Sequence, residues 1–217
     1  MVERSKWYEV DENGNLVKDE KGITKWGSEH IRRDNAIKEY LKKNRTDLLK
    51  WADDNGLYSE DEDFLLREVL SRILSTKAIE QHYSKIQVGV NGMIPYSSVL
   101  KEGDIKMPEM KCHYDINVKG IPFESKFKSS DFDQWGEEFV SFKKGEYLST
   151  EKKAIIVIPH WGGVVSAYRL CDSKPPKDGW NHSASTAAKS NNNVEEQALV
   201  FKRSDALWTE IIPMPFK

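Results

Sequence analysis

The chain has 217 residues, with 33 Lys and Arg against 35 Asp and Glu, and a formal net charge of −2. Hydrophobic residues make up 38% and charged residues 31%, which is typical of a globular protein and argues against a disordered one. No apolar run reaches the length of a membrane span, the start lacks the apolar core of a signal peptide, and two cysteines provide no disulfide framework. We therefore expect one cytoplasmic domain without a membrane contact.

The first 83 residues are predicted to be mainly helical. After a small hairpin turned at Asn13-Gly14, apolar residues at helical spacing predict a helix from Ser28, as its N-cap, to about Asn44, and a short second helix over 47–53. The pattern Ser59-x-x-Glu62 is a capping box, and it opens the strongest helix in the chain, which runs to about Tyr83.

The stretch 111–128 predicts a β-hairpin that organises the rest of the chain. Apolar and polar residues alternate along both of its arms, and Lys119-Gly120 forms the turn between them. A two-residue turn places Val118 opposite Ile121, and the same register places Asp115 opposite Glu124.

This carboxylate pair predicts a metal site. Opposed residues on antiparallel strands have Cβ atoms ~5 Å apart, where two like charges are destabilising and a divalent cation would reverse the effect. Oxygen ligands from Asp115 and Glu124 suit Mg²⁺, with Mn²⁺ as a substitute. Lys126, on the same face, would stabilise charge on a phosphoryl group or orient an attacking water.

Asp115 followed by Glu124-Ser125-Lys126 resembles the signature of the PD-(D/E)xK nuclease superfamily, although Tyr114 stands where the family name has proline. The resemblance implies that Asp115 and Glu124 bind the catalytic metal, that the Ser125 carbonyl completes the coordination, and that Lys126 assists the nucleophilic water. It also implies an additional acid on a preceding helix, for which Glu68 is the candidate. The alternatives are an exposed hairpin with ordinary surface charges, and a surface Glu68 beside Arg67 and Arg72.

Beyond the hairpin, aromatic residues at helical spacing predict a helix around Trp135, and the apolar run 154–159 predicts a buried strand beside the metal strand. Further strands are expected at VVSAYRL, ALVFKRS and LWTEIIP. The polar stretch 173–193 is expected to be either a DNA-contacting loop or a mobile surface loop. Candidate DNA contacts are Lys128, Lys143, Lys144, Lys177, Asn181, His182 and Lys189.

These expectations combine into a single α/β (α+β) nuclease domain over 1–217: a helical part, 1–83, and a central mixed sheet flanked by helices, 84–217, with a restriction endonuclease-like core. The expected function is Mg²⁺-dependent hydrolysis of double-stranded DNA by a Type II restriction endonuclease, acting as a homodimer. The choice of this type rests on the resemblance and on the size of the chain. The alternatives are an exonuclease, a junction resolvase, or a non-catalytic DNA-binding or structural protein. The net charge of −2 argues against a general binder of phosphate, but it is compatible with a nuclease whose carboxylates bind a cation.

Overall fold

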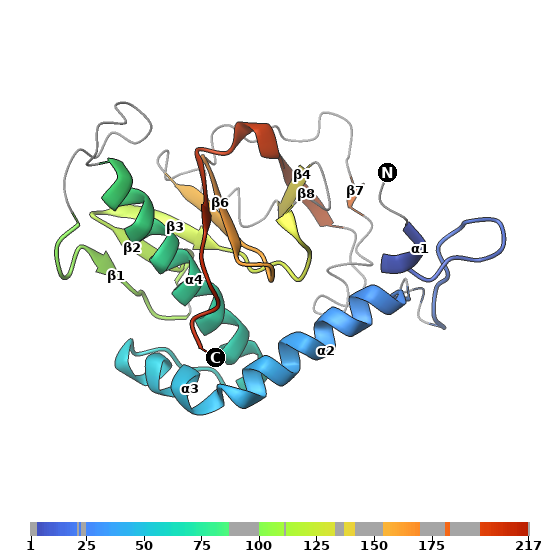
Figure 1. Cartoon of the computed structure of the whole chain (residues 1–217), viewed down its shortest axis with the longest axis horizontal. Coiled ribbons are helices and arrows are strands. Elements are labelled where there is room, and N and C mark those ends of the chain that lie inside the picture. The colour runs from blue at the N-terminus through green and yellow to red at the C-terminus, as the bar shows by residue number, and fades with distance from the viewer. Residues whose placement is uncertain are drawn as a thin grey trace.

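The fold consists of a helical layer, a central sheet and a second, smaller sheet (Figure 1). The computed structural model describes residues 4–20, 22, 25–86, 100–110, 112–132, 137–141, 154–169, 181–182 and 196–216. No helix of this described part of the chain is long and apolar enough to cross a membrane.

The described residues ahead of the sheets form the helices α1 (Arg4–Trp7), α2 (Ser28–Lys43), α3 (Arg45–Asp54) and α4 (Glu62–Ile86). Ser28 is the first helical residue and Gly27 the N-cap, so the predicted role of Ser28 as N-cap is wrong. The predicted capping box at Ser59 and Glu62 is also wrong. Asp61 instead accepts the Phe64 N–H at 3.0 Å, whereas Glu62 pairs with Arg45. Helix α4 extends through Ile86, slightly beyond the end predicted near Tyr83.

The central sheet has six strands in the order β1 (Ile105–Lys106), β2 (Ile116–Val118), β3 (Ile121–Ser125), β5 (Ile155–Pro159), β6 (Val164–Arg169) and β9 (Trp208–Ile211). Neighbouring strands are antiparallel except β3 and β5, which are parallel. The mixed sheet and the buried strand beside the hairpin are therefore confirmed.

The second sheet has three strands in the order β4 (Glu137–Ser141), β8 (Glu196–Lys202) and β7 (Asn181–His182), and the turn η3 (Arg203–Asp205) follows β8. Strand β4 shows that the predicted helix around Trp135 is wrong over Glu137–Ser141, whereas 133–136 lie outside the described residues. Its residues pair in antiparallel register with β8, from Glu137 opposite Lys202 to Ser141 opposite Ala198. Pairing with a strand about 60 residues later therefore overrides the local helical spacing.

The hairpin β2–β3 has the predicted register from the turn to the pair of Ile116 and Phe123, but the predicted pairing of Asp115 with Glu124 is wrong, because the Asp115 N–H donates to the Phe123 carbonyl at 2.9 Å. Val118 pairs with Ile121 and Ile116 with Phe123. Lys119 and Gly120 both have positive φ, 51° and 84°, as a two-residue hairpin turn of the primed type requires. The predicted first arm is too long, however, because β2 begins at Ile116 and residues 112–115 form bends.

Each face of the central sheet has its own hydrophobic core. On one face Phe123, Val157 and Ala167 pack with the apolar side of α4, which lies across the sheet in Figure 1. On the other face Ile156 and Tyr168 pack with Leu199 and other residues of the second sheet. Strands β3 and β5 are therefore buried on both faces.

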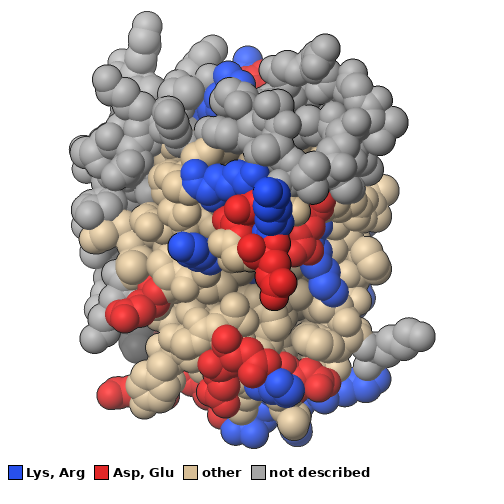
Figure 2. All heavy atoms as spheres, turned by 90° about the vertical axis from the view of Figure 1, so that its left-hand side faces the viewer, with Lys and Arg blue, Asp and Glu red and all other residues tan. Residues whose placement is uncertain are grey.

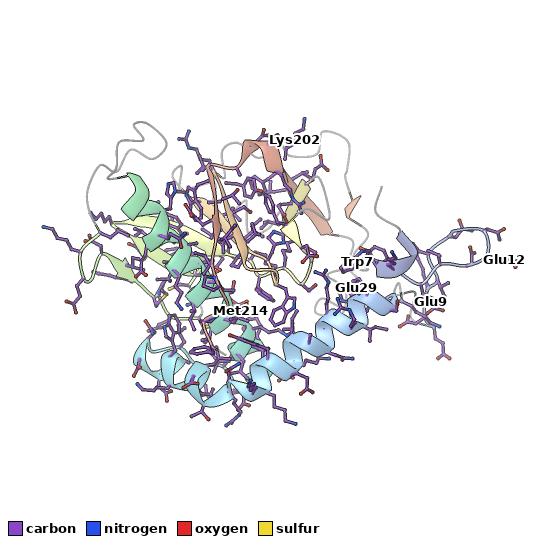
Figure 3. The ribbon with its side chains drawn as sticks, viewed as in Figure 1. Trp7, Glu9, Glu12, Glu29, Lys202 and Met214 are labelled. Carbon is purple, nitrogen blue, oxygen red and sulfur yellow. The ribbon has the colours of Figure 1, made fainter. Side chains whose placement is uncertain are left out.

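The N-terminal and C-terminal segments pack against different parts of the fold. Met214, in the C-terminal segment, packs against the core next to α4 (Figure 3). Trp7 lies beside Glu29 where α1 meets α2, and the Arg33 guanidinium is 4.9 Å from the centre of the Trp7 ring. Glu9 and Glu12 lie on the N-terminal loop that extends away from the sheet.

Candidate active site at the β2–β3 hairpin

Asp115 is buried, with 5% of its surface exposed, and both of its carboxylate oxygens are hydrogen-bonded. Oδ1 accepts from the Arg72 guanidinium at 2.7 Å, and Oδ2 accepts from the backbone N–H of Ser125 at 2.8 Å. Strand β2 begins at Ile116 and does not reach Ser125, so the Asp115 carboxylate accepts the Ser125 N–H in place of a strand carbonyl. Asp115 therefore fixes the end of the hairpin against α4.

Arg72 supplies the charge that balances Asp115. It lies in α4 with 1% of its surface exposed, so the interpretation of Arg72 as a surface residue is wrong. A second guanidinium nitrogen donates to the Pro108 carbonyl at 3.2 Å. A buried charge of this kind is tolerated only when it is paired and hydrogen-bonded, which explains an arginine inside the apolar stripe of α4.

Ser125 connects β3 to α4 through its side chain. Its hydroxyl oxygen lies 2.6 Å from that of Ser71 and 2.7 Å from that of Ser75, and all three residues are buried. The side chain of Ser125 is therefore engaged in the helix-facing core. Only its carbonyl is available for the role that the family resemblance implies.

Glu124 is buried, with 1% of its surface exposed, and its side chain lies on the face of β3 opposite to the Ser125 side chain, so it does not share a face with the residues that contact α4. Its partner on β5 is Ile156, whose side chain belongs to the core between the two sheets. The Glu124 side chain therefore points into the core between the two sheets, whereas the N–H of the next residue, Ser125, donates to the Asp115 carboxylate. With both acids buried, the alternative of an exposed hairpin with ordinary surface charges is wrong.

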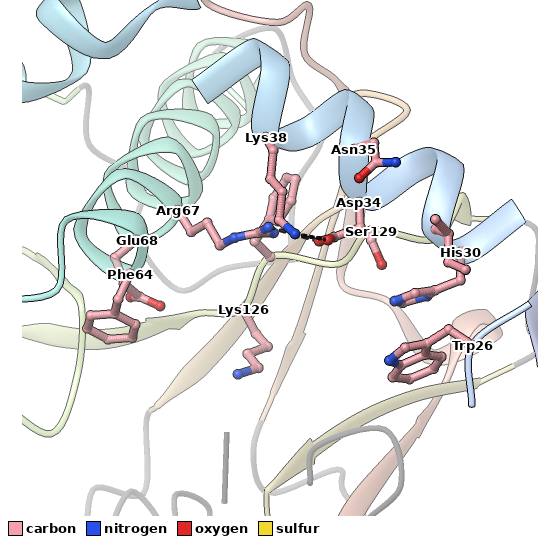
Figure 4. Close-up of a pocket in the computed structure, with 12 residues that line it drawn as sticks. Trp26, His30, Asp34, Asn35, Lys38, Phe64, Arg67, Glu68, Lys126 and Ser129 are labelled. Carbon is pink, nitrogen blue, oxygen red and sulfur yellow. Dashed lines mark hydrogen bonds and ion pairs between the residues drawn. The ribbon is translucent and has the colours of Figure 1, made fainter. Parts of the chain in front are cut away.

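Lys126 follows β3 and is exposed at the wall of a pocket of about 550 Å³. Its backbone N–H still donates to Val157 at 2.9 Å, so the residue is held to the end of the parallel pair β3/β5. Glu68, partly buried on α4, lines the same pocket (Figure 4). The structure therefore brings together Lys126 and the predicted additional acid.

Lys128 lies in a second group of charges beside the same strand ends. Buried Glu138 lies 3.0 Å from His160 Nε2 and 3.2 Å from Arg203. Burial lowers the pKa of the Lys128 ammonium to about 8, and the negative charge of Glu138 opposes this shift. Lys128 is half-buried rather than fully exposed, which reduces the surface that it offers to DNA.

The hairpin supplies oxygen atoms of the kind that magnesium prefers, although Glu124 lies on the other face of β3 from the Ser125 side chain. Magnesium is commonly held by one or two carboxylates, with water and substrate oxygens completing the set. Asp115, Glu124 and the Ser125 carbonyl supply such oxygens, and the described residues contain no group of three or more His, Cys, Asp or Glu that would form a complete cage. Arg72 competes for Asp115, so a cation there would share or replace its contact.

The remaining predicted DNA contacts are only partly described. Lys143, Lys144, Lys177 and Lys189 lie outside the described residues, as does most of 173–193. Asn181 and His182 form β7 and pair with Gln197 and Glu196. In the view of Figure 2, basic and acidic side chains of the described residues lie interspersed, without a broad basic field, as the net charge suggests.

Sequence reasoning missed several residues around this site. Arg72, Glu138, His160 and Arg203 were not selected, and neither were the pocket residues Trp26 and Phe64. One signal was available for Arg72, because an arginine in the run Val69–Leu74, whose other residues are apolar or a serine, predicts a buried partner. The others come together only through contacts that are distant in sequence.

Comparisons with protein-family models, with curated proteins and with solved structures give no match for this chain. The functional argument therefore depends on the residues and their geometry alone.

Proposed function

We propose that this chain is a Mg²⁺-dependent deoxyribonuclease that hydrolyses phosphodiester bonds of duplex DNA, acting as a homodimeric restriction endonuclease in the cytoplasm. The observation that carries the proposal is the local arrangement at β3. Glu124 is buried, and the backbone N–H of the next residue, Ser125, donates to the Asp115 carboxylate. Lys126, two residues after Glu124, lines a pocket. The three residues therefore lie within one short stretch of the hairpin, which supports the proposal without bringing the two carboxylates onto one face.

The proposed chemistry assigns a role to each residue. Asp115 and Glu124 would hold the cation, with the Ser125 carbonyl as a further ligand. When bound, Mg²⁺ neutralises charge on the phosphoryl group and lowers the pKa of water. Lys126 would neutralise a non-bridging phosphate oxygen and orient the attacking water, because its ammonium is exposed and forms no ion pair with any described residue. The water oxygen forms a bond to phosphorus and releases a proton to solvent, the bond to the leaving oxygen breaks, and that oxygen takes up a proton from solvent.

One observation favours a second candidate, a non-catalytic DNA-binding or structural protein. The Arg72–Asp115 pair and the Ser125 N–H satisfy Asp115 without a cation. In that case the two acids only stabilise the hairpin, and the removal of Mg²⁺ should leave every property of the protein unchanged.

Incubation of the purified protein with long duplex DNA tests the proposal. We expect discrete bands with Mg²⁺ and intact DNA with a chelator. A smear or progressive shortening would indicate an exonuclease, and cleavage confined to branched DNA a junction resolvase. Intact DNA under all conditions, with a properly folded protein, would support the second candidate.

A further inference from the structure

The pocket next to Lys126 is lined by neither Asp115 nor Glu124, so it lies beside the buried acids of the hairpin and does not contain them. It is formed by the segment at the start of α2, the first turns of α4 and the residues after β3 (Figure 4). Its volume of about 550 Å³ lies within the ~300–1,000 Å³ range of small-molecule pockets. A site of this size accommodates more than the single phosphate that the proposed hydrolysis requires.

Exposed apolar side chains are concentrated at this pocket. Among the described residues, the large hydrophobic side chains that are exposed are Ile31, Tyr58, Phe64 and Ile211, and Ile31 and Phe64 line the pocket with 50% and 49% of their surface exposed. An exposed aromatic ring at the rim of a pocket is a natural partner for a planar ligand.

A second aromatic surface lies across the pocket from Phe64. The rings of Trp26 and His30 stack with centroids 3.8 Å apart and planes 13° apart, and Tyr8 stacks on Trp26 at 5.6 Å. Figure 4 shows Trp26 and His30 on one side, Phe64 and Glu68 on the other, and Lys126 between them. The pocket therefore offers aromatic groups on both sides of a cationic one.

The charges of the lining favour a ligand with one negative charge. Three cations, Lys38, Arg67 and Lys126, face two carboxylates, Asp34 and Glu68. Lys38 and Arg67 both bind Asp34, at 2.7 and 2.9 Å. Burial acts to raise the pKa of Asp34, but these hydrogen bonds outweigh it and the pKa is lowered, so this acid stays ionised and occupied. Lys126, by contrast, has no ion-pair partner among the described residues.

We propose that this pocket binds a single nucleotide, with its base packed against Phe64 and its phosphate beside Lys126. The choice of a deoxynucleotide as the ligand rests on the proposed function. The binding of a planar ring and an anionic group follows from the pocket lining itself. The nucleotide comes either from a DNA strand, as an unpaired residue next to the cleaved bond, or from solution. Both sources present the same planar base and anionic group.

Binding in a buffer with a chelator tests the pocket without any cleavage. The probes are thymidine monophosphate, thymidine, inorganic phosphate and a single-stranded oligonucleotide of four thymidines, titrated by calorimetry. We expect the monophosphate to bind more tightly than thymidine or phosphate alone. Phe64→Ala should weaken the binding of the monophosphate about 5- to 150-fold, the range for the loss of one base stack. Tyr58→Ala is the matched control, because Tyr58 is 75% exposed and lies outside the pocket lining.

Two results would overturn the inference: equal affinity for phosphate and for the monophosphate, or equal losses in Phe64→Ala and Tyr58→Ala when both variants unfold at the wild-type temperature. Tighter binding of the oligonucleotide, also lost in Phe64→Ala, assigns the nucleotide to a DNA strand, and equal binding assigns it to solution. Loss of nucleotide binding with intact cleavage would refute the pocket alone. Nucleotide binding without cleavage would refute the proposed function alone.

Discussion

The buried pair of Arg72 and Asp115 should dominate the stability of the hairpin. The two groups are 2.7 Å apart, with side-chain exposures of 1% and 7%, so neither is hydrated when its partner is removed. Removal of one member of such a pair costs about 3–5 kcal/mol. At roughly 2–4 °C per kcal/mol for a chain of this size, Asp115→Ala should lower the unfolding temperature by roughly 6–20 °C.

A double-mutant cycle with urea unfolding measures this coupling. The variants are Asp115→Ala, Arg72→Met and the combination of both, and Lys126→Ala serves as an exposed control that we expect to stay within ~0.5 kcal/mol of the wild type. The double variant should lose less than the sum of the two single losses, because no uncompensated charge then remains buried. Additive losses, or a loss below ~1 kcal/mol in Asp115→Ala, would refute the reasoning.

Three further predictions concern neighbouring groups. Ser125→Ala should cost about 1–3 kcal/mol in urea unfolding, because two buried hydroxyls lose their common partner, whereas exposed Ser204→Ala should have almost no effect. Hydrogen bonds from Arg32 and Arg33 lower the pKa of Glu29 to about 2, so NMR titration should show Glu29 ionised at pH 3. Its contribution to stability should be lost as the pH falls from about 4.5 through 2. A titration midpoint near 4.5 would contradict this contact. Burial lowers the pKa of Lys128 to about 8 from 10.5, so between pH 8 and 10.5 the unfolded chain binds more protons than the folded one. The free energy of unfolding should therefore rise with pH across this range, and Lys128→Met should remove that rise.

The register of the hairpin was predictable from the sequence because it depends on local information. Alternation fixes which residues share a face, and Lys119-Gly120 fixes the turn, so Val118 opposite Ile121 follows. Strand β5 was predictable for a similar reason, since five consecutive apolar residues suit a strand that is covered on both sides.

Features that depend on distant partners were not predictable. The segment 132–142 has helical aromatic spacing, but β4 forms there because β8 offers a complete antiparallel register. An arginine on a helix is ordinarily assigned to the surface, and Arg72 is buried only because Asp115, 43 positions later, binds it in the core. The candidate site was therefore identified by its acids and lysine, whereas the cation that balances Asp115 required the three-dimensional structure.

The most direct test of the central claim is the single-turnover rate of duplex DNA cleavage with Mg²⁺ at saturating protein. Glu124→Gln keeps the volume of a buried side chain, and Lys126→Ala removes an exposed one, so both variants should fold. Lys106→Ala, at an exposed lysine on β1 outside the pocket lining, is the matched control. We predict that Glu124→Gln and Lys126→Ala each lower the rate at least ~100-fold while Lys106→Ala retains it. Wild-type rates in Glu124→Gln or in Lys126→Ala would contradict the assignment of the hairpin as the catalytic site.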